Sequence, residues 1–119
     1  MKNKIYLILT VSFLTFNSCT SDSVSDLEGI NETNVTYSST VKSIIDNNCI
    51  QCHAATPVNG APMSLTTYEN VKDAVLNRDL IDRISRAEGS PGAMPLGGPR
   101  LSQNNIDEIN NWAANNFPL

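Results

Sequence analysis

The chain has 119 residues, of which 40% are hydrophobic and 17% charged, and this composition is typical of one globular domain. Twelve Asp and Glu outnumber eight Lys and Arg, so the formal net charge is −4. These values exclude a disordered or fibrous chain. The sequence also lacks a cluster of basic residues that could hold phosphate, which argues against a nucleic-acid-binding surface.

The first residues predict a signal peptide. Lys2 and Lys4 supply a positive start, and residues 5–16 form a mainly apolar run that is too short to span a bilayer. Removal of residues 1–18 would take both lysines away and change the formal charge from −4 to −6. We therefore expect an exported protein with a lipoprotein-type signal peptide at residues 1–18.

The four residues that end at Cys19, Phe-Asn-Ser-Cys, resemble the bacterial lipobox, in which a small residue precedes a lipidated cysteine. The Phe and the Asn depart from its usual residues, so ordinary cleavage nearby is the alternative. Residues 20–34 contain no Lys or Arg and are rich in Ser, Thr, Asp and Asn, which is typical of a flexible tether. Residues 19–34 are thus predicted to anchor the domain at 35–119 to a membrane, facing the periplasm or the cell surface.

Residues 49–53 read Cys-Ile-Gln-Cys-His, the C-x-x-C-H pattern of covalent haem attachment. Each thiol can add across one haem vinyl group, and two intervening residues let both sulfurs reach the same porphyrin edge. His53 follows Cys52 directly, which places its imidazole to bind the iron as the proximal axial ligand. With haem on Cys49 and Cys52 and lipid on Cys19, none of the three cysteines would remain as a free thiol.

Other uses of a C-x-x-C pair fit this chain less well. A redox-active dithiol of the thioredoxin type normally follows a strand in a βαβ unit, and no such pattern is present. A closed zinc site needs four ligands, whereas the chain has one His and no second cysteine pair. A disulfide between Cys49 and Cys52 would close a very short loop and stabilise little. Haem attachment is the interpretation that uses all three residues.

From about Val35 to the C-terminus, the chain resembles the single-haem c-type cytochromes. The resemblance implies an all-α, cytochrome c-like fold of three to five short helices around one covalent haem c. It implies that the last helix crosses the first and closes the domain over the haem edge. It also implies that a proline carbonyl accepts the free ring N–H of His53, and Pro62 is the candidate for that role.

Apolar stripes with helical spacing predict the two helices on either side of the motif. The first stripe leads into Cys49 and follows a run of candidate N-caps; the stripe is Val41, Ile44 and Ile45, and the caps are Ser38, Ser39 and Thr40. The second helix is expected to open at Leu65, with capping-box spacing between Thr66 and Glu69. Its predicted core residues are Tyr68, Val71, Val75 and Leu76.

Two further helices are predicted nearer the C-terminus. A short third stripe consists of Leu80, Ile81 and Ile84. The last helix is expected to begin behind an N-cap at Ser102 and to reach about Asn116. Its apolar face is Ile106, Ile109, Trp112 and Ala113.

Residues 89–99 contain four Gly and three Pro in eleven positions, which excludes a regular helix or strand. Such a loop needs an ordering contact, because fixing its backbone costs about 1 to 2 kcal/mol per residue. Met94-Pro95 in a Gly- and Pro-rich loop before a final helix is the distal-ligand pattern of the family. The resemblance therefore implies the Met94 sulfur as the second axial ligand. Leu96 departs from the pattern, since many relatives have a second proline there.

Alternatives to Met94 are few. His53 is the only histidine, which excludes a second histidine ligand from the same chain. Met63 lies ten residues after His53, so the chain would have to pass quickly from one haem face to the other. Packing of the Met63 side chain under the haem is the simpler interpretation. Lys42 and Lys72 are more remote alternatives.

With both axial positions filled, the iron would have no open site for oxygen or substrate, so the predicted function is one-electron transfer and not catalysis. The expected partners are redox proteins such as oxidase, reductase or dehydrogenase subunits, and the acidic charge favours a basic surface on a soluble partner. Arg83 and Arg100 would either pair with haem propionates or stay solvated. The alternative function is a haem enzyme or sensor, peroxidase-like, with an open distal site.

Overall fold

A computed structural model describes residues 35–119 of the chain. The predicted signal peptide, Cys19 and the tether lie outside these residues. The described part contains a π-helical turn and four short α-helices, which are η2 (Tyr37–Val41), α1 (Lys42–Asn48), α2 (Tyr68–Asn77), α3 (Leu80–Ser85) and α4 (Gln103–Ala114). Residues 35–119 contain no strand, so the predicted all-α class is confirmed. None of these helices is long and apolar enough to cross a membrane.

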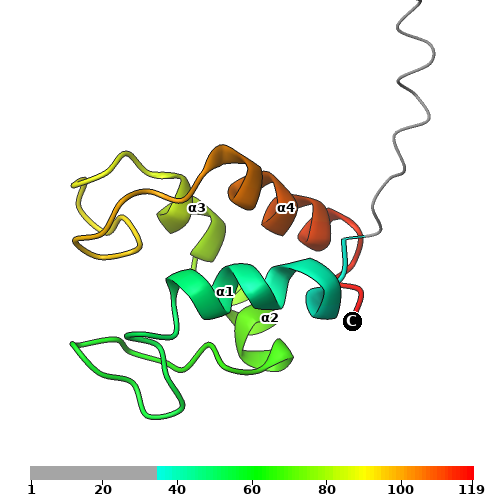
Figure 1. Cartoon of the computed structure of the whole chain (residues 1–119), viewed down its shortest axis with the longest axis horizontal. Coiled ribbons are helices and arrows are strands. Elements are labelled where there is room, and N and C mark those ends of the chain that lie inside the picture. Colours follow the sequence, from blue (N-terminus) through cyan, green and yellow to red (C-terminus); the bar gives the residue numbers. More distant parts are fainter. Residues whose placement is uncertain (1–34) are drawn as a thin grey trace, which may run out of the picture. The chain divides into compact units, whose positions relative to one another are not determined.

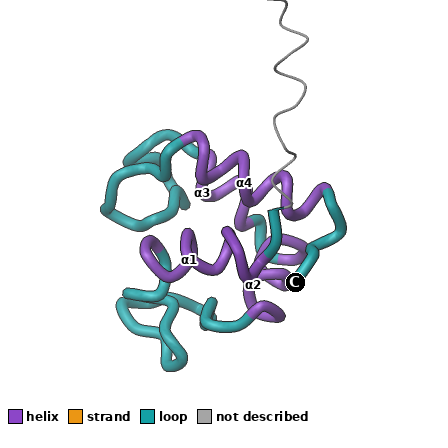
Figure 2. Tube along the Cα trace, turned by 45° about the vertical axis from the view of Figure 1, so that its right-hand side comes forward, coloured by secondary structure: helices purple, strands orange, loops and turns teal. Residues whose placement is uncertain are grey.

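α1 continues directly from η2, and the loops gather at one end (Figure 1). α4 packs on η2 and on α3, and α3 also packs on α2. The loop that follows α1 and the loop that follows α3 lie at the same end, as both views of the backbone show (Figure 2). The C-terminal segment returns to the opposite end, where the Tyr37 N–H donates to the Pro118 carbonyl (2.9 Å).

The first helical segment begins two to four residues earlier than predicted. Thr36 is the N-cap, because its side chain accepts from the Ser39 N–H (3.1 Å) and the Ser39 hydroxyl accepts from the Thr36 N–H (3.2 Å). This reciprocal pair is a capping box made with a serine. The prediction of Ser38, Ser39 or Thr40 as the cap was therefore wrong. An earlier start places Tyr37 in the first turn, where it is buried.

The predicted N-cap is correct for α4 and wrong by one residue for α2, and α2 begins at Tyr68 and not at Leu65. The Ser102 side chain accepts from the Asn105 N–H (3.2 Å), so Ser102 is the N-cap of α4. In α2 the cap is Thr67, whose side chain accepts from the Asn70 N–H (3.2 Å). Thr66 bonds to the Ser64 hydroxyl instead (2.9 Å), outside the helix. α4 ends at Ala114, slightly before the predicted end.

The core is built mainly from the predicted stripes. Fully buried side chains come from every helix and from the segment before α2, and they are Val41, Ile45, Leu65, Val71, Ile84, Ile106, Ile109 and Trp112. The prediction of Leu76 as a core residue was wrong, since it is 58% exposed. Ala74 is buried on the inner face of α2, and Val75 packs only partly against the core. Since these helices have at most 12 residues, packing and not intrinsic propensity stabilises them.

Four aromatic rings fill the end of the molecule that is opposite the two loops. Trp112 is wholly buried and contacts Tyr37, Tyr68 and Phe117, with ring centroids 5.9, 5.9 and 4.9 Å away. The Trp112 Nε1–H donates to the Pro118 carbonyl (2.9 Å) and the Tyr68 hydroxyl donates to the Phe117 carbonyl (2.7 Å). The aromatic cluster thereby ties α2, α4 and the C-terminal segment together.

A pair of tyrosine substitutions tests how much the hydroxyl of Tyr68 contributes to the free energy of unfolding. Tyr68→Phe should lower the free energy of unfolding by about 1 kcal/mol, because it keeps the ring and removes the hydroxyl, which donates to the Phe117 carbonyl and accepts a longer hydrogen bond from the Lys72 ammonium (3.4 Å). Tyr37→Phe is the matched control, since the Tyr37 hydroxyl has no hydrogen-bond partner within residues 35–119. It should change the free energy by less than about 0.5 kcal/mol. Urea unfolding measures both, and equal losses would contradict this account of the hydrogen bond.

Candidate functional site

The end of α1 delivers the C-x-x-C-H residues as one compact turn. The Cys49 N–H donates to the Ile45 carbonyl (2.8 Å), which continues the helical pattern to the first cysteine. The Cys49 carbonyl then accepts from both the Cys52 N–H (3.2 Å) and the His53 N–H (3.0 Å). Ile45 is buried in the core, so the turn is fixed to the centre of the domain. Both cysteines are free thiols in this structure.

The imidazole of His53 is held in one orientation. Its Nδ1 lies 2.8 Å from the Met63 carbonyl oxygen, and a carbonyl can only accept, so Nδ1 carries the proton. In the neutral ring, the other nitrogen, Nε2, then carries the free lone pair. The Leu65 N–H donates to the His53 carbonyl (2.8 Å), and the residue is only 9% exposed. The prediction that the Pro62 carbonyl accepts the hydrogen bond from the His53 ring was wrong. The carbonyl of its neighbour, Met63, accepts it.

Met94 lies in the loop after α3, and the backbone of that helix fixes its place. The Met94 N–H donates to the Arg83 carbonyl in α3 (3.0 Å). The preceding residue, Ala93, is buried, and its N–H donates to the Ser90 carbonyl (3.0 Å). Leu96 is 75% exposed and does not join the core. The loop thus has a defined path at Met94 although it contains no helix or strand.

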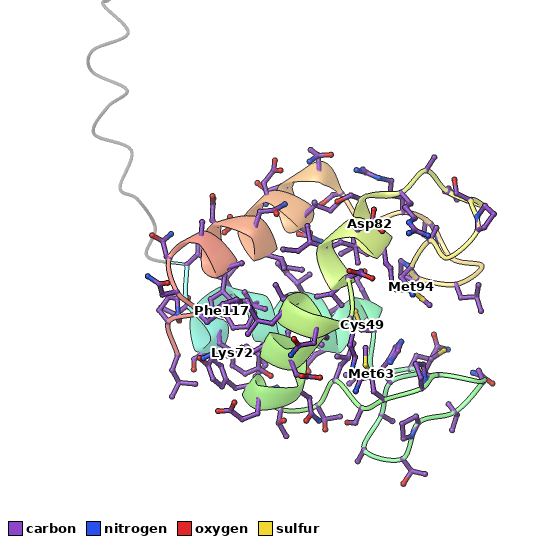
Figure 3. All side chains as sticks on the ribbon, turned by 180° about the vertical axis from the view of Figure 1, so that it is seen from behind. Cys49, Met63, Lys72, Asp82, Met94 and Phe117 are labelled. Carbon is purple, nitrogen blue, oxygen red and sulfur yellow. The ribbon has the colours of Figure 1, made fainter. Side chains whose placement is uncertain are left out.

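The two loops, α3 and the link between α2 and α3 line an open cavity of about 810 Å³. All four residues that the sequence singled out line it, namely Cys49, Cys52, His53 and Met94. Its size lies within the range of about 300 to 1,000 Å³ that is usual for sites of small molecules and cofactors. Figure 3 places Met94 and Met63 on the two loops with Cys49 between them, far from Lys72 and Phe117 at the aromatic end.

The wall of the cavity is apolar with a few charged groups. The apolar lining includes Ala61, Met63, Leu65, Leu80, Ile84 and Leu101. Arg83, Arg78 and Asp79 also line it. Arg100, the other predicted partner for an anionic group, is not part of the lining, and its guanidinium donates to the Ser85 carbonyl (3.2 Å) and the Gln103 side chain (3.0 Å).

Sequence reasoning missed the contribution of the link between α2 and α3. Arg78 and Asp79 lie in that link, and the Asp79 backbone has a positive φ of 56°. The left-handed conformation of an Asp there was not visible in the apolar pattern, although short polar side chains tolerate it better than most. The remote alternatives to Met94, Lys42 and Lys72, do not line the cavity, and Lys72 lies over the rings of Tyr68 and Phe117 instead.

The two thiols differ in their surroundings. Burial raises the pKa of the Cys49 thiol from 9.0 to about 11, which disfavours its thiolate. Cys49 also caps the carboxyl end of α1, where the helix dipole disfavours negative charge. The Cys52 sulfur accepts a hydrogen bond from the Asn59 side chain across the loop (3.5 Å). Nucleophilic cysteines normally have the opposite environment, at a helix N-terminus or beside a cation.

No protein family, curated protein or solved structure matches this chain. Within residues 35–119, no three His, Cys, Asp or Glu side chains come together as a cluster that could hold a metal ion. The candidate site therefore rests on its own geometry, which is an apolar cavity with two thiols, one oriented imidazole and one thioether.

Alkylation can measure the effect of burial on Cys49 before any group is attached. In Cys52→Ala protein at pH 8, iodoacetamide should modify Cys49 about a hundredfold more slowly in the folded state than in urea, because raising the pKa by about two lowers the thiolate fraction by that factor. The rate in the folded protein should rise steeply between pH 9 and 11. Equal rates in the two states would show that the thiol is not buried.

Proposed function

We propose that this chain is an electron carrier with one covalent haem c, bound through Cys49 and Cys52 and held between His53 and Met94. The observation that supports the proposal most directly is that these four residues line one cavity, although Met94 lies 41 positions after His53 in the chain. A short motif alone would be weak support. The resemblance to c-type cytochromes also predicted that a methionine from a distant loop would lie near this motif.

The residues present fit a haem. The cavity has the apolar wall that a porphyrin requires, and Arg78 and Arg83 lie in that wall, where they can pair with propionate carboxylates. Cys49 and Cys52 sit on one turn after α1, as attachment to a single porphyrin edge demands. A bound haem would supply an iron that changes its charge by one electron. We further propose that the four helices are a cytochrome c-like fold.

His53 and Met94 would have distinct tasks in this carrier. The Met63 carbonyl holds the His53 Nδ1–H, so Nε2 is free to bind iron and its basicity is increased by the hydrogen bond. The Met94 thioether is a soft, neutral ligand that favours the reduced state and raises the potential. Together they would occupy both axial positions and keep water and oxygen away, which suits electron transfer better than catalysis.

The rival functions are supported less well. A haem enzyme or sensor would need Met94 to leave the iron, whereas its loop is fastened to α3 by the bond between the Met94 N–H and Arg83. A thioredoxin-like dithiol would need an accessible thiolate, whereas burial holds the pKa of Cys49 near 11. Carbon monoxide binding to the reduced protein separates the carrier from the enzyme or sensor.

The setting proposed for this carrier comes from the sequence. Lipid on Cys19 would anchor the protein outside the cytoplasm, and the tether would let the domain reach redox partners such as oxidase, reductase or dehydrogenase subunits. Residues 35–119 hold eight Asp and Glu against six Lys and Arg, so the domain itself is only mildly acidic. The other four acids of the chain lie before residue 35.

Covalent haem is the first test of the proposal. Protein made in cells that attach haem to C-x-x-C-H should show a sharp alpha band when reduced and should keep its colour after denaturation. Cys49→Ala/Cys52→Ala should lose the colour on denaturation, because no thioether remains. Cys19→Ser is the matched control, since it removes the one cysteine that is not part of the C-x-x-C-H pattern, and it should keep the haem while losing the membrane anchor. A colourless wild-type protein would refute the proposal.

The distal ligand is tested by the two methionines of the cavity. Met94→Ala should abolish the weak near-infrared sulfur-to-iron band of the oxidised protein, lower the reduction potential and let carbon monoxide bind the reduced protein. Met63→Leu should leave all three nearly unchanged, because it preserves the carbonyl that holds His53 and replaces a wall residue by one of similar size. The reverse pattern would assign the ligand to Met63.

A further inference from the structure

Arg86, the residue after α3, joins that helix to the loop of Met94. Its Nε and Nη2 donate to one oxygen of Asp82 (3.0 and 2.5 Å), one helical turn earlier. Its Nη1 donates to the Pro91 carbonyl (2.6 Å), three residues before Met94. The three bonds share one rigid guanidinium, so the position of Pro91 is set by Asp82 through Arg86.

Gly92 leaves the space that this contact needs. A Cβ atom at this position would clash with the Arg86 Nη1, and it would lie 3.4 Å from the Arg83 Nη1. The backbone of Gly92 also has a φ of +75°, a conformation that side chains disfavour. The loop therefore folds around the Arg86 guanidinium at the residue next to Pro91.

Arg83 provides a second connection on the same side of the loop. Its carbonyl accepts from the Met94 N–H (3.0 Å), and its Nη1 lies 3.4 Å from the Gly92 carbonyl. The end of α3 thus contacts the backbone of residues 91, 92 and 94. In Figure 3, Asp82 lies on α3 beside this loop. Met94, on the loop, and Cys49 both line the cavity.

We propose that Arg86 is a positioning residue that keeps the Met94 sulfur on the iron, an inference that rests on the proposed His53 and Met94 ligation. A loop rich in Gly and Pro gains much backbone freedom when it detaches, so the ligated state needs contacts that exist only when the loop is docked. The charge-assisted bond from Arg86 to Pro91 is such a contact. Asp82 orients the guanidinium and so supports the same state.

Imidazole titration of the oxidised haem protein measures this role. Imidazole can occupy the distal position only after the sulfur has left, so its apparent affinity reports the fraction of protein with the loop detached. Arg86→Gln should raise the apparent affinity about tenfold, which corresponds to about 1.4 kcal/mol. Arg86→Lys should give a smaller increase, because a single ammonium can reach one acceptor but cannot reproduce the fork. The near-infrared sulfur-to-iron band should decline in step with bound imidazole.

Lys42→Gln is the matched control. Lys42 forms an ion pair with Asp46 at the same i,i+4 spacing as Arg86 and Asp82, but it lies on α1 and does not line the cavity. Its loss should leave the imidazole affinity unchanged. Equal affinity in Arg86→Gln and wild type, or an equal increase in Lys42→Gln, would overturn the role of Arg86. A wild-type protein without the near-infrared band would refute the Met94 ligation, and the role of Arg86 with it.

Discussion

The hydrogen bond between the His53 ring and the Met63 carbonyl is the constraint on which the site depends. It fixes the proton on Nδ1 and directs Nε2, the atom that can bind a metal. It also closes the loop that follows the C-x-x-C-H turn, together with the bond from the Leu65 N–H to the His53 carbonyl. Since Leu65 is buried, the ring orientation is tied to the core and not to a free loop.

The two loops around the cavity are fixed in different ways, and this difference matters for function. The loop after α1 is held by groups that belong to the site itself, since the ring of His53 makes one of its bonds. The loop of Met94 is held from outside by the end of α3, through the carbonyl of Arg83 and the side chain of Arg86. The loop after α1 therefore depends on the His53 ring, whereas the loop of Met94 depends on a backbone carbonyl and a charged side chain at the end of α3.

The local motifs of this sequence could be predicted, whereas their tertiary setting could not. Cys49, Cys52 and His53 were singled out by residue type and spacing, and Met94 by the resemblance to the c-type cytochromes; the cavity brings the four together. The choice of Pro62 for the carbonyl that holds His53 failed by one residue, because the path of a loop decides which carbonyl faces inward.

The errors at the helix ends have a similar origin. A run of hydroxyl side chains precedes α1, and which of them caps the helix depends on the burial of Tyr37, a tertiary effect. The aromatic cluster at the C-terminus was also missed in part, since Phe117 follows the last helix and joins Trp112 only through a turn of the chain. The sequence did not indicate that Arg78 lines the cavity, because its position there depends on the path of the link between α2 and α3.

The wall of the cavity and the hydrophobic core share side chains. Leu65, Ile84 and Leu101 line the cavity and are also among the buried residues of the core. An apolar group in the cavity would extend the core on that side, so its binding free energy would add to the free energy of folding. The aromatic cluster around Trp112 lies at the other end and has none of its four rings in the cavity wall. Substitutions in the cluster should therefore act on stability alone, whereas substitutions in the shared wall act on stability and on the site together.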